Sequence, residues 1–262
     1  MKIALVSLTQ EWEDKKANLF KCEGCIQKAS QAKVDLIVFP EMTLTGFSNN
    51  IIVTAEDKDE STTLKSFQDI ARKFSIAIVF GVAIQDGEKA LNQSIFIDKN
   101  GVLKAQYSKI HPFSFAREDK FFNSGNRLGV VNFEDFKIGL SICYDLRFPE
   151  LYSTLSTKTD LIINIANWPS KRIEHWNTLL KARAIENQIF IAGVNRVGVD
   201  GNDLEYIESS QIINANGESL EYQEIEDMKI YTIDKAWTRN FKDKFNTTND
   251  RKVEFYKEIL SC

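Results

Sequence analysis

The segment FKIGLSICYDLRFPEL, which runs from Phe136 to Leu151, joins a strand pattern directly to a helix pattern. Residues 136–142 form an apolar run of strand length, and residues 147–157 have helical spacing. Cys143 therefore lies on a sharp strand-to-helix turn. Such a turn exposes the side chain and places backbone N–H groups beside it, which lower the pKa of a thiol and can hold an oxyanion. From this position alone, a buried structural cysteine is the alternative.

The rest of the chain alternates strand-like and helix-like runs. Strands are predicted at residues 2–8, 34–39, 76–84, 160–166, 189–195 and 229–234, and helices at residues 13–33, 58–74 and 172–187. Hairpins are predicted for residues 91–98 with 102–108 around Asn100-Gly101, for 128–133 with 136–142, and for 207–213 with 218–223 around Asn216-Gly217. This order indicates a layered α/β fold with a mixed sheet.

No linker or repeat interrupts the pattern, so residues 1–262 are predicted to form a single domain. The last ~25 residues mix charged and aromatic side chains with a weak helical pattern, and we interpret them as an extension or a dimer arm.

The composition is that of an ordinary soluble globular protein. Hydrophobic residues make up 43% of the chain and charged residues 27%, and the net charge is −4. No basic stripe is present to neutralise phosphates, so nucleic-acid binding is not expected. No stretch has the apolar length of a membrane span, and the start MKIALVSLTQ becomes polar too early for a signal peptide. We therefore expect a cytoplasmic protein with reduced thiols.

Two charged residues follow predicted strands in the same way as Cys143. Glu41 comes after VDLIVF and Pro40, and Lys109 ends VLKAQYSK. Taken singly, each is as readily a solvated surface side chain. The carboxyl ends of strands can, however, converge on one ligand-binding crevice. Together the three residues supply a nucleophile, a proton acceptor and a cation for an oxyanion, the set needed to hydrolyse an amide through a thioester.

Three segments that contain these residues resemble the nitrilase superfamily of carbon–nitrogen hydrolases: PEMTLTGF (40–47), YSKIHPF (107–113) and ICYDLRFPEL (142–151). Further matches are NWP (167–169), HWNTLLKARAIENQ (175–188) and VNRVGVDGN (194–202). The resemblance implies a four-layer αββα sandwich, in which helices flank two mixed sheets and the active site lies between the sheets. It also implies that Glu41 is the base, Lys109 the oxyanion stabiliser and Cys143 the nucleophile.

The resemblance implies a second glutamate in the loop before the Cys143 strand, hydrogen-bonded to the lysine. Glu118, in AREDKFFNSGN, fits that place, and Asp119 is the competing candidate. The backbone N–H of Tyr144 would join Lys109 in the oxyanion hole.

The segments ARAIENQ, VNRVG and DGN resemble the omega-amidase branch, which converts 2-oxoglutaramate or 2-oxosuccinamate to the 2-oxo acid and ammonia. These substrates are small anions, so Arg147 and Arg117 are candidates to bind the carboxylate. Alternatively, Arg147 ties the motif to the backbone or to a nearby carboxylate. Trp168 and Phe115 are candidate pocket walls, although aromatic residues there are as often plain packing.

Other functions stay open at this point. One is a different amidase of the superfamily, acting on N-carbamoyl compounds or deaminated glutathione, and another is a catalytically idle binding protein of the same fold. The resemblance implies a homodimer with a small-molecule amide as substrate.

The remaining cysteines and histidines carry weaker signals. Cys22 and Cys25 form a CxxC without a second pair, and Cys22 is predicted to be a small core residue. Cys262 is terminal and expected to be flexible. His111 is placed at the rim of the site and His175 in packing at a helix start. Two histidines are too few for a His-rich metal centre, so no metal or cofactor is expected.

Overall fold

Uninterrupted apolar runs form the centre of both sheets in the computed structural model, which describes residues 1–260. Strands β1 (Lys2–Val6), β2 (Leu36–Val38), β8 (Leu161–Ala166) and β9 (Phe190–Asn195) are almost entirely buried. Parallel strands that are covered on both faces have such runs, because each face packs against another layer.

The larger sheet has the strand order β13 (Gln223–Ile225), β14 (Met228–Thr232), β1, β2, β3 (Ala77–Asp86), β4 (Lys89–Ile97) and β5 (Leu103–Ser108). Strands β1, β2 and β3 are parallel to each other, and the other pairings are antiparallel. Strand β5 therefore runs in the same direction as β2, with β3 and β4 between them.

The smaller sheet has the order β12 (Gln211–Ile213), β9, β8, β7 (Phe136–Ile142) and β6 (Gly129–Phe133). Strands β7, β8 and β9 are parallel, and both edge pairings are antiparallel. A short ribbon of β10 (Gly198–Val199) and β11 (Glu205–Tyr206) stands apart from this sheet.

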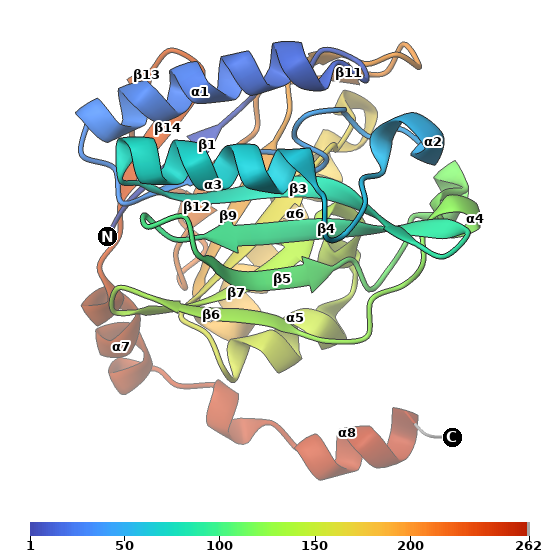
Figure 1. Cartoon of the computed structure of the whole chain (residues 1–262). Helices are drawn as coiled ribbons and strands as arrows, with labels where there is room; N and C mark the ends of the chain where they lie inside the picture. Colours follow the sequence, from blue (N-terminus) through green and yellow to red (C-terminus); the bar gives the residue numbers. More distant parts are fainter. Residues whose placement is uncertain (261–262) are drawn as a thin grey trace.

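Helices cover the outer face of each sheet, which gives the four layers seen in Figure 1. Helices α1 (Lys15–Gln31) and α3 (Thr62–Phe74) pack on the larger sheet, and α5 (Pro149–Ser156) and α6 (Ile173–Asn187) pack on the smaller one. A third apolar cluster fills the space between the sheets. The predicted αββα sandwich is confirmed.

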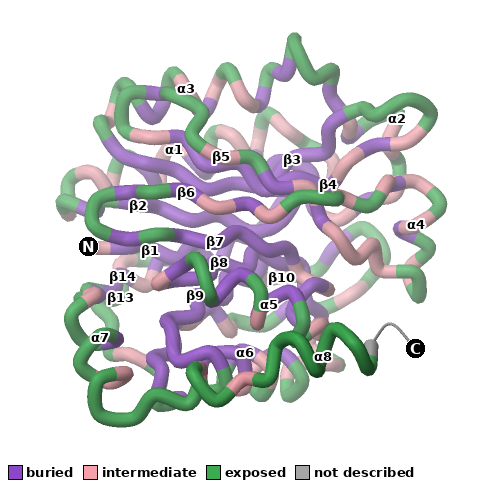
Figure 2. The backbone as a smooth tube through the Cα atoms, turned by 90° about the horizontal axis from the view of Figure 1, so that it is seen from below, coloured by how far each residue is buried: buried purple, intermediate pink, exposed green. Residues whose placement is uncertain are grey.

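Shorter helices lie in the connections and at the C-terminal end: α2 (Ile51–Thr54), α4 (Glu118–Phe121), α7 (Lys235–Lys244), α8 (Val253–Leu260) and the 3-10 turns η1 (Ser114–Ala116), η2 (Cys143–Arg147), η3 (Ser170–Arg172) and η4 (Thr248–Asp250). Helices α7 and α8 lie beside the sandwich, and most of their residues are exposed (Figure 2). No helix within residues 1–260 is long and apolar enough to cross a membrane.

One predicted hairpin is shorter than expected. The turn at Asn216-Gly217 forms, with an antiparallel bridge from Ile213 to Ser219 and a bond from Leu220 N–H to the Ile212 carbonyl, but the pairing does not extend to Gln223, which lies in β13 and pairs with β14. The Asn-Gly dipeptide predicts the local turn, whereas the strands that pair with each other depend on contacts between segments that are distant in the sequence. Cys22 is buried against the larger sheet as predicted, and Cys262 lies outside the described residues.

Candidate active site

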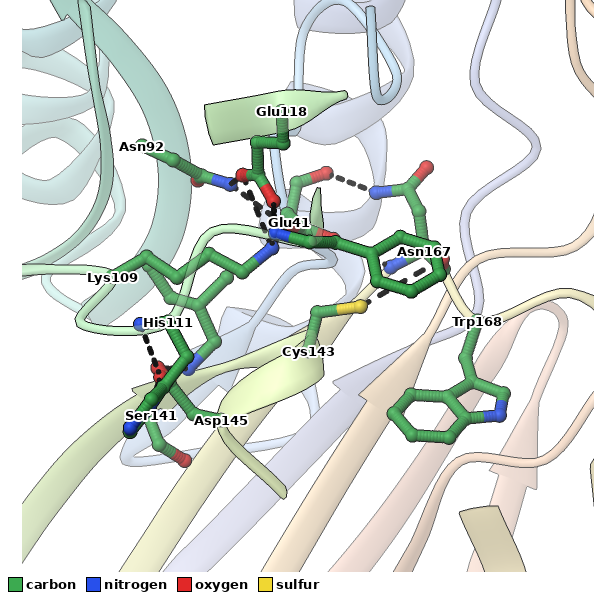
Figure 3. A network of polar contacts seen from close by, with 12 residues as sticks. Glu41, Asn92, Lys109, His111, Glu118, Ser141, Cys143, Asp145, Asn167 and Trp168 are labelled. Atoms are coloured by element: carbon green, nitrogen blue, oxygen red, sulfur yellow. Dashed lines mark hydrogen bonds and ion pairs between the residues drawn. The ribbon is translucent and has the colours of Figure 1, made fainter. Parts of the chain in front are cut away.

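Four strands place the polar side chains of the site at one edge of the sandwich. Glu41 follows β2, Lys109 follows β5, Cys143 follows β7 and Asn167 follows β8. Since β2 runs with β5 and β7 runs with β8, the carboxyl ends of each pair lie at the same edge of their sheet. Figure 3 shows the four side chains gathered there, as predicted for Glu41, Lys109 and Cys143.

Glu41 is fully buried, and its carboxylate is held on both oxygens. Oε1 accepts hydrogen bonds from the Asn92 side-chain amide at 2.8 Å and from Lys109 Nζ at 3.0 Å. Oε2 accepts a bond from the backbone N–H of Asn167 at 2.9 Å. The Asn167 side-chain amide donates to the backbone carbonyl of Glu41 at 2.7 Å, so the carboxylate has a fixed position.

Lys109 lies between two buried carboxylates. Its Nζ is 3.0 Å from Glu41 Oε1 and 2.8 Å from Glu118 Oε2, and the side chain is only 1% exposed. Glu118 is buried too, and it accepts bonds from Asn92 Nδ2 and from the backbone N–H of Phe113. Asp119 instead pairs with Lys120 near the surface. Glu118 therefore occupies the position predicted for the second glutamate.

The electrostatics of this cluster keep Lys109 charged. Burial disfavours the ammonium, but the charges of Glu118 and Glu41 outweigh that effect and raise the pKa of Lys109. Burial raises the pKa of Glu118, the charge of Lys109 opposes this, and the charge of Glu41 adds to it. Removing ions from water costs several kcal/mol each, so the ion pairs and amide contacts are needed to offset that cost.

Cys143 has left-handed backbone geometry, with φ of 44°, at the start of the η2 turn. A side chain in this region costs about 1–3 kcal/mol and is kept where the surroundings enforce it. The thiol is half-buried, and Sγ lies 3.8 Å from the backbone carbonyl of Asn167.

The expectation that the turn lowers the pKa of the Cys143 thiol is wrong. Burial raises the pKa well above its ordinary value, the charge of Glu41 raises it further, and Lys109 only partly opposes them. Burial and the nearby Glu41 carboxylate therefore favour the protonated form of the thiol over the thiolate.

Cys143 and Lys109 open onto a cavity of about 60 Å³. Tyr144, Arg147 and Trp168 line it, as predicted. The guanidinium of Arg147 lies 4.8 Å from the Trp168 ring and donates to His175 Nδ1 at 3.2 Å. Within residues 1–260, no hydrogen bond or ion pair joins Arg147 to the backbone or to a carboxylate, the alternative role considered for it. The other lining residues are Phe47, Phe113, Ala116, Asn167, Pro169, Arg172, Leu204 and Tyr206.

Two predicted lining residues lie elsewhere. Phe115, inside the η1 turn, is 83% exposed, and Arg117, directly after that turn, is exposed as well, whereas Phe113 before it lines the cavity wall. Phe113 and Arg172 line the cavity in their place, and the Arg172 guanidinium lies 5.6 Å from the Phe113 ring.

Neither histidine contacts Cys143 within the described chain. His111 lines a neighbouring groove and binds Asp145, so it is not at the rim of the cavity. His175 is exposed beside Arg147 rather than packed in the core. A cysteine–histidine pair is therefore absent from residues 1–260, and the carboxylate whose charge acts on the thiol is that of Glu41, which is drawn near Cys143 in Figure 3.

Sequence reasoning missed the amides and the aspartate that support these groups. Asn92 begins a short polar run, Asn92-Gln93-Ser94, inside strand β4, and such a run gives no functional signal by itself. Asn167 lies within the NWP segment and Asp145 within CYDLRFPE, so the motifs contained both without showing what they bind.

The family comparison agrees with this geometry. Residues 2–243 match the family model described as carbon-nitrogen hydrolase. Two facing sheets, with a glutamate, a lysine and a cysteine gathered at one edge, are the fold and site of a hydrolase that contains a thiol. The chain belongs to the carbon–nitrogen hydrolase family, in the nitrilase superfamily.

Relatives within the family are named for amidase activity. The chain is 36% identical to omega-amidase YafV of Yersinia enterocolitica over 222 residues, which cover 83% of each chain. It is 35% identical to 2-oxoglutaramate amidase of Paenarthrobacter nicotinovorans, over 86% of this chain and 80% of that one.

A solved structure extends the comparison to three dimensions. A CN-hydrolase superfamily protein from Xanthomonas campestris, which carries an arsenic adduct in its active site, matches with a TM-score of 0.87 and 32% identity. The match covers 96% of this chain and 97% of that one.

Proposed function

We propose that this hydrolase is an omega-amidase, which converts a small 2-oxo acid monoamide such as 2-oxoglutaramate or 2-oxosuccinamate to the 2-oxo acid and ammonia. One observation carries the proposal. A cysteine opens onto a small cavity beside a buried carboxylate–ammonium cluster, and two arginines line the same cavity. The names of the relatives point to the same branch.

In the first half of the reaction, Glu41 takes the thiol proton as Cys143 Sγ attacks the amide carbon. The carbonyl oxygen becomes an oxyanion, which the Lys109 ammonium and the backbone N–H of Tyr144 stabilise. The tetrahedral intermediate then breaks its carbon–nitrogen bond. Glu41 gives the proton to the leaving nitrogen, so ammonia departs and a thioester on Cys143 remains.

In the second half, water replaces ammonia near Glu41. Glu41 takes a proton from the water, whose oxygen attacks the thioester carbon, and the oxyanion forms again beside Lys109. The carbon–sulfur bond breaks, the thiolate regains a proton from Glu41, and the carboxylic acid leaves. Glu118 keeps Lys109 charged and aligned throughout, because both of its carboxylate oxygens accept hydrogen bonds from the ammonium.

The size and charge of the cavity favour a short anionic substrate. A space of about 60 Å³ around the thiol suits a small acyl group. Arg147 and Arg172 would bind the carboxylate at the far end of the substrate through charge-assisted hydrogen bonds.

An ammonia-release assay on a substrate panel tests the proposal. The panel contains 2-oxoglutaramate, 2-oxosuccinamate, an N-carbamoyl amino acid and deaminated glutathione, with Cys143→Ala as the control for background hydrolysis. The proposal expects the two 2-oxo acid monoamides to be preferred. If the N-carbamoyl compound or deaminated glutathione is preferred, the omega-amidase assignment is wrong and the thiol mechanism stands.

A further inference from the structure

Asp145 lies two residues beyond Cys143 and is fully buried, yet it does not line the cavity. Its carboxylate is saturated with donors. Oδ2 accepts bonds from the Tyr107 hydroxyl at 2.7 Å and from the backbone N–H of Ile142 at 3.0 Å. Oδ1 contacts the backbone N–H of His111 at 3.1 Å and His111 Nδ1 at 2.8 Å.

These donors come from two segments that are distant in sequence. Ile142 belongs to the strand and turn that present Cys143. Tyr107 and His111 stand two residues before and two residues after Lys109, and the N–H of Ile110 also binds the Tyr107 hydroxyl oxygen at 3.3 Å. One carboxylate therefore joins the backbone on both sides of Lys109 to the turn that holds the thiol.

The Cys143 turn needs such a support. Its left-handed φ of 44° is unfavourable for a residue with a side chain, and the bond from Ile142 N–H to Asp145 closes the turn across that residue. The same turn aims the backbone N–H of Tyr144. A shift of the turn would move the thiol and the N–H together, relative to the Lys109 ammonium.

We infer that Asp145 is a positioning residue that fixes the register between the Cys143–Tyr144 turn and Lys109, so that both halves of the oxyanion site meet one carbonyl oxygen. The inference rests on the roles proposed above for Cys143 and Lys109. It assigns Asp145 no contact with the reacting atoms.

Asp200 offers a matched control. It is also a buried aspartate, 7% exposed, that accepts a tyrosine hydroxyl, from Tyr206 at 2.8 Å. Its other donors are the backbone N–H groups of Asn202 and Leu204. Asp200 therefore supports the cavity wall made by Leu204 and Tyr206 and not the thiol turn. Loss of its charge should affect substrate fit before it affects the chemistry.

The test compares D145N with D200N, two changes of the same chemistry. An amide has one acceptor oxygen and turns two donors toward N–H and O–H groups, so it cannot keep the contacts that Asp145 makes. We expect D145N to lower kcat about 100-fold with KM nearly unchanged, as for a misplaced reacting group or a lost oxyanion donor. D200N should raise KM and leave kcat within about threefold, because lost uniform binding appears in KM.

A second readout reports the oxyanion site without turnover. The aldehyde 2,5-dioxopentanoate adds the Cys143 thiol across its carbonyl, which forms a carbon–sulfur bond and places the former carbonyl oxygen in that site. Its affinity is measured by protection of Cys143 from iodoacetamide. D145N should weaken the affinity for the aldehyde by about the same factor by which it lowers kcat, as expected for an interaction made in the transition state. A general loss of packing would weaken that affinity equally in D200N.

Two results overturn the inference: equal losses of kcat in D145N and D200N, or unchanged aldehyde affinity in D145N. If D145N does not fold, Tyr107→Phe decides by the same two readouts, because it removes only the hydroxyl between Asp145 and Ile110. It should then lower kcat and aldehyde affinity together, and no loss in either would reject the register role. If the wild-type chain releases no ammonia from 2-oxoglutaramate, the proposed function fails, while the aldehyde comparison still tests Asp145.

Discussion

The floor of the cavity and its rim are held in place by different forces. The floor consists of Cys143 and Lys109, which line the cavity, together with Glu41 and Glu118, which bind the Lys109 ammonium. Glu41, Lys109 and Glu118 are at most 1% exposed, and each makes two or more charged or amide contacts. On the rim, the half-buried Arg147 and Arg172 lie against aromatic rings at 4.8 Å and 5.6 Å. Such contacts contribute only about 0.5–1 kcal/mol at exposed sites. The difference suggests a rigid floor that performs the chemistry and an adaptable rim that selects the substrate.

The largest effect should come from the nucleophile on the floor. Cys143→Ala is expected to lower kcat at least ~10⁴-fold, since the covalent route is lost. The fold should persist, because only a half-buried sulfur is removed. Ammonia release and thermal unfolding measure the two properties. Unfolding of the variant, with no change in turnover per folded molecule, would show that the thiol is structural.

The general base should have the next largest effect. Glu41→Gln keeps the size of the side chain but removes the proton acceptor, so kcat should fall about 10²–10⁴-fold while substrate still binds. Steady-state kinetics and calorimetric titration with substrate separate the two. Near-normal kcat would remove Glu41 from the mechanism.

Changes at the rim should alter binding more than chemistry. Arg147→Met and Arg172→Met are each expected to raise KM for 2-oxoglutaramate about 10- to 100-fold, the size of a lost charge-assisted contact, with kcat largely retained. A neutral amide of similar length is the control substrate, and its kcat/KM should not change. An equal loss for both substrates would mean that the arginines support the fold of the rim and do not bind a carboxylate.

The raised pKa of Cys143 predicts a smaller, pH-dependent effect. Alkylation requires the thiolate, and a raised pKa means that the folded protein holds the thiol proton to higher pH than a free thiol does. In Glu41→Gln, where burial remains the main cause of the raised pKa, iodoacetamide should react with Cys143 at pH 8 more slowly than with glutathione. The rate should still rise at pH 10. A plateau below pH 8 would indicate a low pKa and contradict this electrostatic account.

The floor was more predictable from the sequence than the rim. Glu41 and Cys143 each follow a clear apolar strand, and Lys109 follows the more polar edge strand β5. Strands that run in the same direction within a sheet bring such ends to one edge. Glu118 was found only through the family motif, because a polar loop carries no periodicity that could place it.

The residues of the rim could not be predicted from strand patterns, because turns decide which of their side chains face the cavity. Phe113, just before the η1 turn, faces the cavity, whereas Phe115, inside that turn, faces solvent, and Arg172 reaches the cavity from the end of the η3 turn. The sign of the pKa shift at Cys143 also required the structure, since it depends on how burial and the charge of Glu41 compare with the charge of Lys109. In the fold, local turn chemistry predicted Asn216-Gly217 correctly but not the partner of β13.

Rapid acid quench during turnover of 2-oxoglutaramate, followed by peptide mass spectrometry, tests the central claim most directly. The account predicts that the acyl group of the substrate is carried by the peptide with Cys143 before steady state, and that the peptide with Cys22 and Cys25 stays unmodified. Ammonia release with the acyl group on another residue, or with none on Cys143 at any time point, would contradict a reaction in which Cys143, Glu41 and Lys109 act on one carbonyl.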